Sequence, residues 1–302
     1  MPVDAATALA AAPVSREIAW GPGDVQLYHL GIGAGVPATD PRELRYTLET
    51  RLHVLPGFAT VAGGGPPGVI RALSVPGVDV DLARVLHAGQ SLTPHRPIPV
   101  RGTATAVSRV TAVYDKGTAA LLVLRTEAAD ADGPLWTEEA LVHVRGEGGW
   151  GGDRGPSGRP APPAGPPDAA VERAVREDQA LLYRLTGDRN PLHADPEFAA
   201  RAGFGRPVLH GLCTYGMALK AAVDTLLDGD VGRVRSYTTR FAGVVYPGET
   251  LRVRMWRQGP EGRKEPGELE GLEEPEGRIR MTVTAVERDD ASVLTDTVVG
   301  YR

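Results

Sequence analysis

Three polar side chains stand close together in a turn-forming part of the sequence. The stretch YRLTGDRNPLHADPEFA, residues 183–199, places Asp188, Asn190 and His193 within six positions. Gly, Asp, Asn and Pro are ordinary turn residues, so a solvated loop is the plain explanation. An acid, an amide and an imidazole are also groups that can position water and move protons. The two halves of the chain help to choose between these explanations.

A weak internal repeat favours the chemical explanation. The first half reads YHLGIGAGVPATDP from Tyr28, and the second reads YRLTGDRNPLHADP from Tyr183, with four identities in fourteen aligned positions. At the positions of Asp188, Asn190 and His193, the first copy has two glycines and an alanine. A turn that needed these groups only for its geometry should need them in both copies. The trio therefore predicts an acid–base site in the second half.

Two other chemical patterns are weaker. His193, Asp195 and Glu197 offer metal-ligand atoms, but Asp195 matches Asp40 of the first copy, where no other ligand stands. Helix capping explains both aspartates better, so we expect no metal. The single cysteine, Cys213, excludes an intramolecular disulfide and a Cys-based zinc site. GIGAG at residues 31–35 lacks the spacing of a dinucleotide-binding loop, so no cofactor is expected either.

The pattern along the chain predicts two similar halves. Residues 153–168, DRGPSGRPAPPAGPPD, have the composition of an extended linker, which divides the chain into residues 1–152 and 169–302. Runs of Val and Thr with period two, bounded by Gly or Asp, predict antiparallel strands within residues 99–146 and 236–302.

Residues 212–227 have apolar side chains at helical spacing, and Gly216, Ala218 and Ala221 keep this helix thin. The acidic, Gly/Pro-punctuated residues 259–277 predict a hairpin extension, to which we assign no function. A thin helix followed by strands predicts an α+β fold in which a sheet wraps around a helix.

Composition excludes several classes of protein. The 302 residues are 42% hydrophobic, enough for a substantial core. The net charge is −5 and arginines are scattered, which argues against a nucleic-acid-binding groove. No window approaches the ~20 apolar residues of a membrane span. The N-terminus lacks the basic start and long apolar run of a secretory signal, so the expected location is the cytoplasm.

The longest motif resembles a known family. YRLTGDRNPLHADPEFAARAGFGRPVLHG, residues 183–211, looks like the hydratase 2 motif of the MaoC-like (R)-specific enoyl-CoA hydratases. RFAGVVYPGETL, residues 240–251, resembles their following strand, and LHAGQSLTPHRPIPVRGTAT, residues 86–105, resembles the first half of their two-domain members. The resemblance implies a double hot-dog fold: two long helices, each wrapped by an antiparallel sheet, with the sheets joined edge to edge.

The resemblance also implies roles for residues. Asp188 and His193 become the catalytic pair, Asn190 orients water and the pair, and the backbone N–H of Gly211 donates to the thioester oxygen. Which member of the pair moves which proton stays open. His210 holds the turn before Gly211 or contacts substrate. For Arg206, which could meet a CoA phosphate, an ordinary surface charge is an equal alternative.

The implied reaction is the reversible syn addition of water to trans-2-enoyl-CoA, giving (3R)-3-hydroxyacyl-CoA, with the CoA thioester as substrate. Alternatives are a dehydratase acting on acyl-carrier-protein thioesters in lipid or polyketide synthesis, a thioesterase, a non-catalytic acyl-thioester binding protein, and a subunit that works only with a partner. A homodimer is a further expectation. Gly31, Gly33 and Gly35, with GGGPPG at residues 63–68, suggest that the first half leaves space for a long acyl chain.

Overall fold

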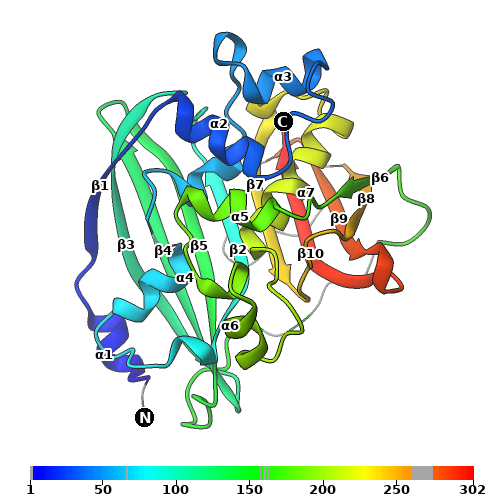
Figure 1. Cartoon of the computed structure of the whole chain (residues 1–302). Helices are drawn as coiled ribbons and strands as arrows, with labels where there is room; N and C mark the ends of the chain where they lie inside the picture. The colour runs from blue at the N-terminus through cyan, green and yellow to red at the C-terminus, as the bar shows by residue number, and fades with distance from the viewer. Residues whose placement is uncertain (1–2, 66, 157, 159–160, 162, 260–274) are drawn as a thin grey trace.

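The computed structural model describes residues 3–65, 67–156, 158, 161, 163–259 and 275–302. In this part of the chain, ten strands form one antiparallel sheet, and the helices lie over one of its faces (Figure 1). The strands of the first half are β1 (Val14–Trp20), β2 (Val85–Pro94), β3 (Gly102–Asp115), β4 (Ala119–Asp130) and β5 (Gly133–Arg145). Those of the second half are β6 (Ala169–Ala174), β7 (Val234–Phe241), β8 (Thr250–Gln258), β9 (Gly277–Ala285) and β10 (Ala291–Tyr301).

The strand order repeats about the middle of the sheet. The sheet runs β1-β3-β4-β5-β2-β7-β10-β9-β8-β6, so each half has the same order when read outward from the β2–β7 junction. Gly89 of β2 lies opposite Arg240 of β7 at this junction. Two sheets joined edge to edge were expected, and the junction confirms them. The boundaries of the halves, residues 1–152 and 169–302, remain a prediction, because the sheet is continuous across them.

The long strands agree with the periodic runs of the sequence, whereas β1, β2 and β6 were not predicted from periodicity. β1 and β6 are the edge strands of the sheet and are mostly exposed, so few of their residues are held by the core. β2 contains an irregularity between His87 and Gly89 that disturbs its alternation.

The acidic insert joins β8 to β9, which pair with Gln258 opposite Arg278. Residues 260–274 of that insert lie outside the described part of the chain.

Helix α7 (Gly211–Leu226) is the centre of the core, as residues 212–227 predicted. Thirteen of its sixteen residues are buried. Tyr215 of α7 and Tyr237 of β7 stack at 4.1 Å, and each hydroxyl donates to the other residue's carbonyl, at 3.1 and 3.0 Å. At Gly216 a β-carbon would lie 2.7 Å from both the Tyr28 hydroxyl and Ile32, so the helix must be thin here.

The first half differs from expectation in one respect, since no second helix of this length occurs among the described residues. Its helices are α1 (Ala5–Ala10), α2 (Pro22–Gly31), α3 (Pro41–Thr47) and α4 (Gly68–Arg71). Between α3 and β2 the chain forms 3₁₀ turns η1 (Glu49–Arg51), η2 (Pro56–Val61), η3 (Ala72–Ser74) and η4 (Leu82–Arg84) around α4. Gly63, Gly64 and Gly65 all have positive φ, which interrupts any helix at this point. None of the described helices is long and apolar enough to cross a membrane.

The structure places the two copies of the repeat side by side. α2 contacts α5 (Gln179–Tyr183), and the Tyr28 and Tyr183 rings lie 6.4 Å apart. Asp40 caps α3 through the Arg42 amide, and Asp195 caps α6 (Pro196–Arg201). The capping role predicted for Asp195 is therefore confirmed.

The remaining turns of the second half are η5 (Arg184–Thr186), η6 (Pro191–His193), η7 (Val231–Arg233) and η8 (Val286–Arg288).

We expect Gly216→Ala to lower the free energy of unfolding by about 1–3 kcal/mol, because the methyl group would press on Tyr28 and Ile32. Gly23→Ala in α2 is the matched control, since nothing lies within 4 Å of a β-carbon there. It should be neutral or slightly stabilising, because alanine has the higher helix propensity. Urea denaturation measures both variants. Equal stability of the two would contradict the packing argument.

Candidate active site

The turn that carries Asp188, Asn190 and His193 is held by hydrogen bonds between its own side chains and backbone, and by a close contact with the first half. Gly187 has φ +136°, and a β-carbon there would collide with the backbone of Gly65 in the first half. The Asp188 carboxylate accepts from the Asn190 amide at 3.1 Å. The Asn190 side-chain oxygen accepts from the Leu192 amide at 3.1 Å and caps η6. These turns fold the chain back so that Asp188 and His193 approach each other.

His193 is buried in one defined tautomer. Its Nδ1 lies 2.8 Å from the carbonyl oxygen of Val208. A carbonyl only accepts, so Nδ1 carries the hydrogen and the neutral ring keeps its lone pair on Nε2. Nε2 lies 4.0 Å from Oδ2 of Asp188. The structure therefore brings the predicted acid and imidazole together, with the basic nitrogen facing the carboxylate.

His210 supports both members of this pair. Its ring stacks on His193 with centroids 3.7 Å apart, and its Nε2 donates to the backbone carbonyl of Asp188 at 3.2 Å. The ring is 1% exposed, and its Nδ1 has no hydrogen-bond partner in the described part of the chain. This position agrees with the predicted role of His210 in holding the turn before Gly211. Direct contact between His210 and substrate remains a prediction.

Burial keeps both imidazoles neutral. It lowers the pKa of His193, although the nearby Asp188 carboxylate acts in the opposite direction. Burial lowers the pKa of His210 further, and the stacked His193 adds to this effect. A neutral His193 with a free lone pair is a competent proton acceptor near neutral pH.

Gly211 is the first residue of α7, with His210 as the N-cap. Its N–H has no acceptor within the helix, and the helix dipole favours negative charge at this end. A β-carbon at Gly211 would lie 3.1 Å from the ring of Phe241. The position suits a donor to a developing oxyanion, and this role of Gly211 remains a prediction.

Two arginines bear on the predicted site. Arg206 is exposed on the loop before α7, with its guanidinium 5.0 Å from the centre of the Tyr246 ring, so its substrate contact stays a prediction. Arg184 was not singled out from the sequence, yet its charge helps to lower the pKa of both His193 and His210. The Val208 carbonyl was also missed, because a backbone acceptor leaves no trace in a side-chain pattern.

Asp188, His193 and His210 present ligand atoms within 4.8 Å of one another, which raises the question of a metal. The two rings are stacked with an interplanar angle of 28°, so their free lone pairs lie in nearly parallel planes. Zinc instead requires ligands that converge at about 2.0–2.1 Å. This geometry suits acid–base chemistry better than coordination. The absence of a metal remains a prediction.

Cys213 is a buried packing residue. Its thiol donates to the carbonyl of Gly31 at 3.2 Å, and burial raises its pKa. A thiol with a raised pKa is a poor nucleophile.

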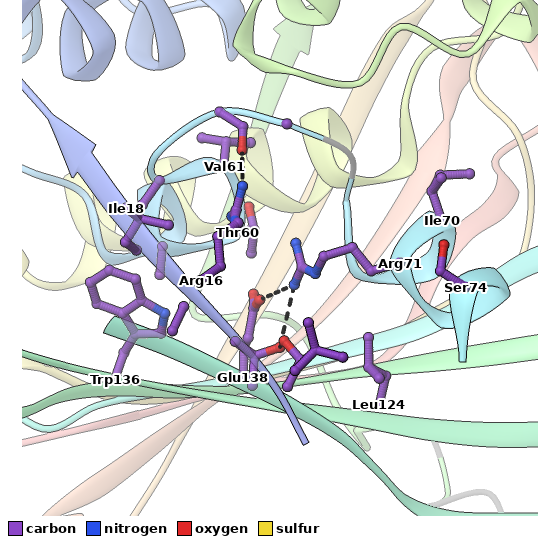
Figure 2. Close-up of a pocket in the computed structure, with 18 of the residues that line it drawn as sticks. Arg16, Ile18, Thr60, Val61, Ile70, Arg71, Ser74, Leu124, Trp136 and Glu138 are labelled. Carbon is purple, nitrogen blue, oxygen red and sulfur yellow. Dashed lines mark hydrogen bonds and ion pairs between the residues drawn. The ribbon is translucent and has the colours of Figure 1, made fainter. Parts of the chain in front are cut away.

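A cavity of about 200 Å³ lies beside this site, in the first half (Figure 2). Neither Asp188 nor His193 lines it. Its wall includes Gly64 and Gly65, and Gly65 packs directly on Gly187. The first half therefore leaves space at Gly64 and Gly65, and the use of this space by a long acyl chain remains a prediction. The glycines at 31, 33 and 35 do not line it.

We expect the His193 and His210 imidazoles to titrate below the ordinary value of about 6.5. As the pH falls through 6.5, these two imidazoles take up protons in the unfolded chain but remain neutral in the folded protein. The free energy of unfolding therefore falls as the solution is acidified. NMR titration of the imidazole resonances, assigned with His193→Ala, measures these pKa values. A His193 pKa at or above 6.5 would contradict the argument from burial.

We expect Gly187→Ala to disturb the site, because its methyl group would collide with Gly65. Gly133→Ala is the control, since Gly133 also has a positive φ but nothing lies within 4 Å of its β-carbon. Both variants carry the backbone strain, and only Gly187→Ala should also shift the His193 and His210 resonances. Unchanged resonances in Gly187→Ala would show that the contact with Gly65 does not position the turn.

Two families match the chain, one in each half. Residues 20–146 match the MFE-2 hydratase 2 N-terminal domain, and residues 159–274, which contain the site, match the MaoC like domain. Among known proteins, the enoyl-CoA hydratase ChsH3 of Mycobacterium tuberculosis is 47% identical over 98% of each chain.

Solved structures agree with this assignment. A MaoC-like dehydratase from Phytophthora capsici matches with a TM-score of 0.81 and 28% identity, over 99% of this chain and 98% of that one. A Mycobacterium tuberculosis protein described as a double hotdog fold matches in fold, with a TM-score of 0.54 and 18% identity, over 96% of this chain and 94% of that one. The chain belongs to the MaoC-like, hydratase 2 family and has its double hot-dog fold.

Proposed function

We propose that the protein is an (R)-specific enoyl-CoA hydratase, a hydro-lyase that reversibly adds water to trans-2-enoyl-CoA to give (3R)-3-hydroxyacyl-CoA. The observation that carries this proposal is the pair formed by buried His193 and half-buried Asp188, 4.0 Å apart, next to the N-terminus of α7. The 47% identical relative is named an enoyl-CoA hydratase, which supports the same chemistry here.

One water molecule can serve both members of the pair. Two atoms 4.0 Å apart can each lie about 2.8 Å from a shared water. Nε2 of neutral His193 accepts a proton as the water oxygen bonds to C3, and the Asp188 carboxylate stabilises the imidazolium that forms. The pair then delivers a proton to C2 on the same face. Together, these steps add one water molecule syn across the double bond.

Negative charge collects on the thioester oxygen while the C3–O bond forms. The Gly211 N–H, at the positive end of the α7 dipole, is the donor that we assign to this oxygen. Removing one donor of this kind costs about 10²- to 10³-fold in comparable sites. Asn190 acts by holding the turn, because its side-chain oxygen is bound to the Leu192 amide.

The substrate is a CoA thioester, and the reaction needs neither metal nor cofactor. Proton transfer within the pair and one backbone donor account for every bond change. To Arg206, which is exposed on the loop before α7, we assign a contact with a CoA phosphate. The acyl chain enters the cavity of the first half, whose wall at Gly65 touches Gly187 beside the catalytic turn.

We expect the purified protein to consume trans-2-enoyl-CoA and release the (3R) product, without added cofactor and in the presence of a chelator. Asp188→Asn and His193→Ala should each lower kcat by about 10²- to 10⁴-fold, because each removes one acid–base group. Loss of the conjugated-enoyl absorbance gives the rate, and chiral chromatography gives the configuration of the product.

Asp195→Asn is the matched control, because Asp195 caps α6 and asparagine caps equally well. This variant should keep its activity. Binding of enoyl-CoA without turnover would favour a binding protein, and turnover only of acyl-carrier-protein thioesters would favour the carrier-protein dehydratase. Thioester hydrolysis with the double bond intact would identify a thioesterase.

A further inference from the structure

The cavity of the first half contains a charged cluster that the proposed hydration chemistry does not use. Arg16 of β1, Arg71 of α4 and Glu138 of β5 reach into it from three different elements (Figure 2). Nη2 of Arg71 lies 3.1 Å from Glu138 and 3.3 Å from the Thr126 hydroxyl. Glu138 is 7% exposed, so this ion pair is buried in the cavity wall.

Arg16 adds a second positive charge to this pair. Its Nη1 donates to the carbonyl of Gly64 at 3.0 Å. No carboxylate in the described part of the chain lies within 4.0 Å of its guanidinium. Among the described residues that line the cavity, the charged ones are Arg16, Arg71 and Glu138, which together give a net charge of +1. Burial, together with the charge of Arg71, lowers the pKa of Arg16, although the Glu138 carboxylate acts in the opposite direction.

The rest of the cavity is mainly apolar. Ile18, Ile70, Leu124 and Trp136 line it. A purely hydrocarbon tail would satisfy these walls but would remove water from the Arg16 guanidinium without replacing its hydrogen bonds. Burying a charge in that way is unfavourable. A tail with an oxygen atom at its far end would satisfy both the apolar walls and the guanidinium.

We propose that this cavity selects enoyl-CoA substrates whose acyl group carries a hydrogen-bond-accepting oxygen at its far end, a carboxylate most strongly. Arg16 is the residue that recognises this oxygen, and the Arg71–Glu138 pair fixes the wall beside it. A guanidinium presents several N–H donors to one acceptor and binds a carboxylate in bidentate geometry. This inference rests on the proposed hydratase function and names the class of acyl group for that site.

The test compares trans-2-enoyl-CoA substrates of equal chain length that end in a methyl group, a ketone or a carboxylate, over a series of lengths. At the best length, kcat/KM for the carboxylate substrate should exceed that for the methyl substrate by about tenfold. Preference for the carboxylate alone identifies an anionic tail. Preference for both oxygenated substrates identifies the oxygen itself as the recognised group. Either result supports the proposal.

Arg16→Met should abolish this preference, because it removes the guanidinium donors while keeping an unbranched, flexible side chain. Arg16→Lys should keep part of the preference. Arg109→Met is the control: Arg109 lies on β3, half exposed and paired with Glu127, and does not line the cavity. Equal rates for all three substrates in the wild type, or an unchanged ratio in Arg16→Met, would overturn the inference. If no substrate is hydrated, it is the proposed function itself that fails.

Discussion

The packing of α7 against α2 is the constraint on which the rest of the structure depends. The ten-stranded sheet can pack closely on the helices only if the side chains between α7 and α2 are small. Gly216 meets that requirement, because its missing side chain leaves room for the Tyr28 hydroxyl and Ile32. The Tyr215–Tyr237 clamp then fixes α7 on the sheet. The N-terminus of α7, with His210 and Gly211, is held in place as a result.

The site is organised by backbone carbonyls as much as by side chains. The Val208 carbonyl selects the tautomer of His193, and the Asp188 carbonyl binds His210. The stacked rings share one buried space, so neither gains a proton easily. A neutral base beside an ionisable carboxyl follows from this arrangement. Hydrogen bonds and packing that hold an acid–base group in position commonly decide how well it performs.

The two halves share one strand order but differ in the helices and turns that accompany it. The second half keeps α7 and the polar turn. In the first half, three glycines of positive φ and short helical turns replace the long helix, and a cavity lies there. The Gly65–Gly187 contact joins the cavity wall to the turn that carries Asp188 and His193. In the function that we propose, one copy of the fold does the chemistry and the other accommodates the acyl group.

The sequence by itself determined the features that depend on local pattern. These are the trio at residues 188–193, the span of α7, the long strands, and the Asp195 cap. Only the tertiary structure decided how Val208 and His210 orient the pair, that the first half has no second long helix, and that Arg71 meets Glu138. The last two residues are 67 positions apart. Contacts of that kind follow from how strands and loops pack, and side-chain periodicity records only the face on which a residue lies.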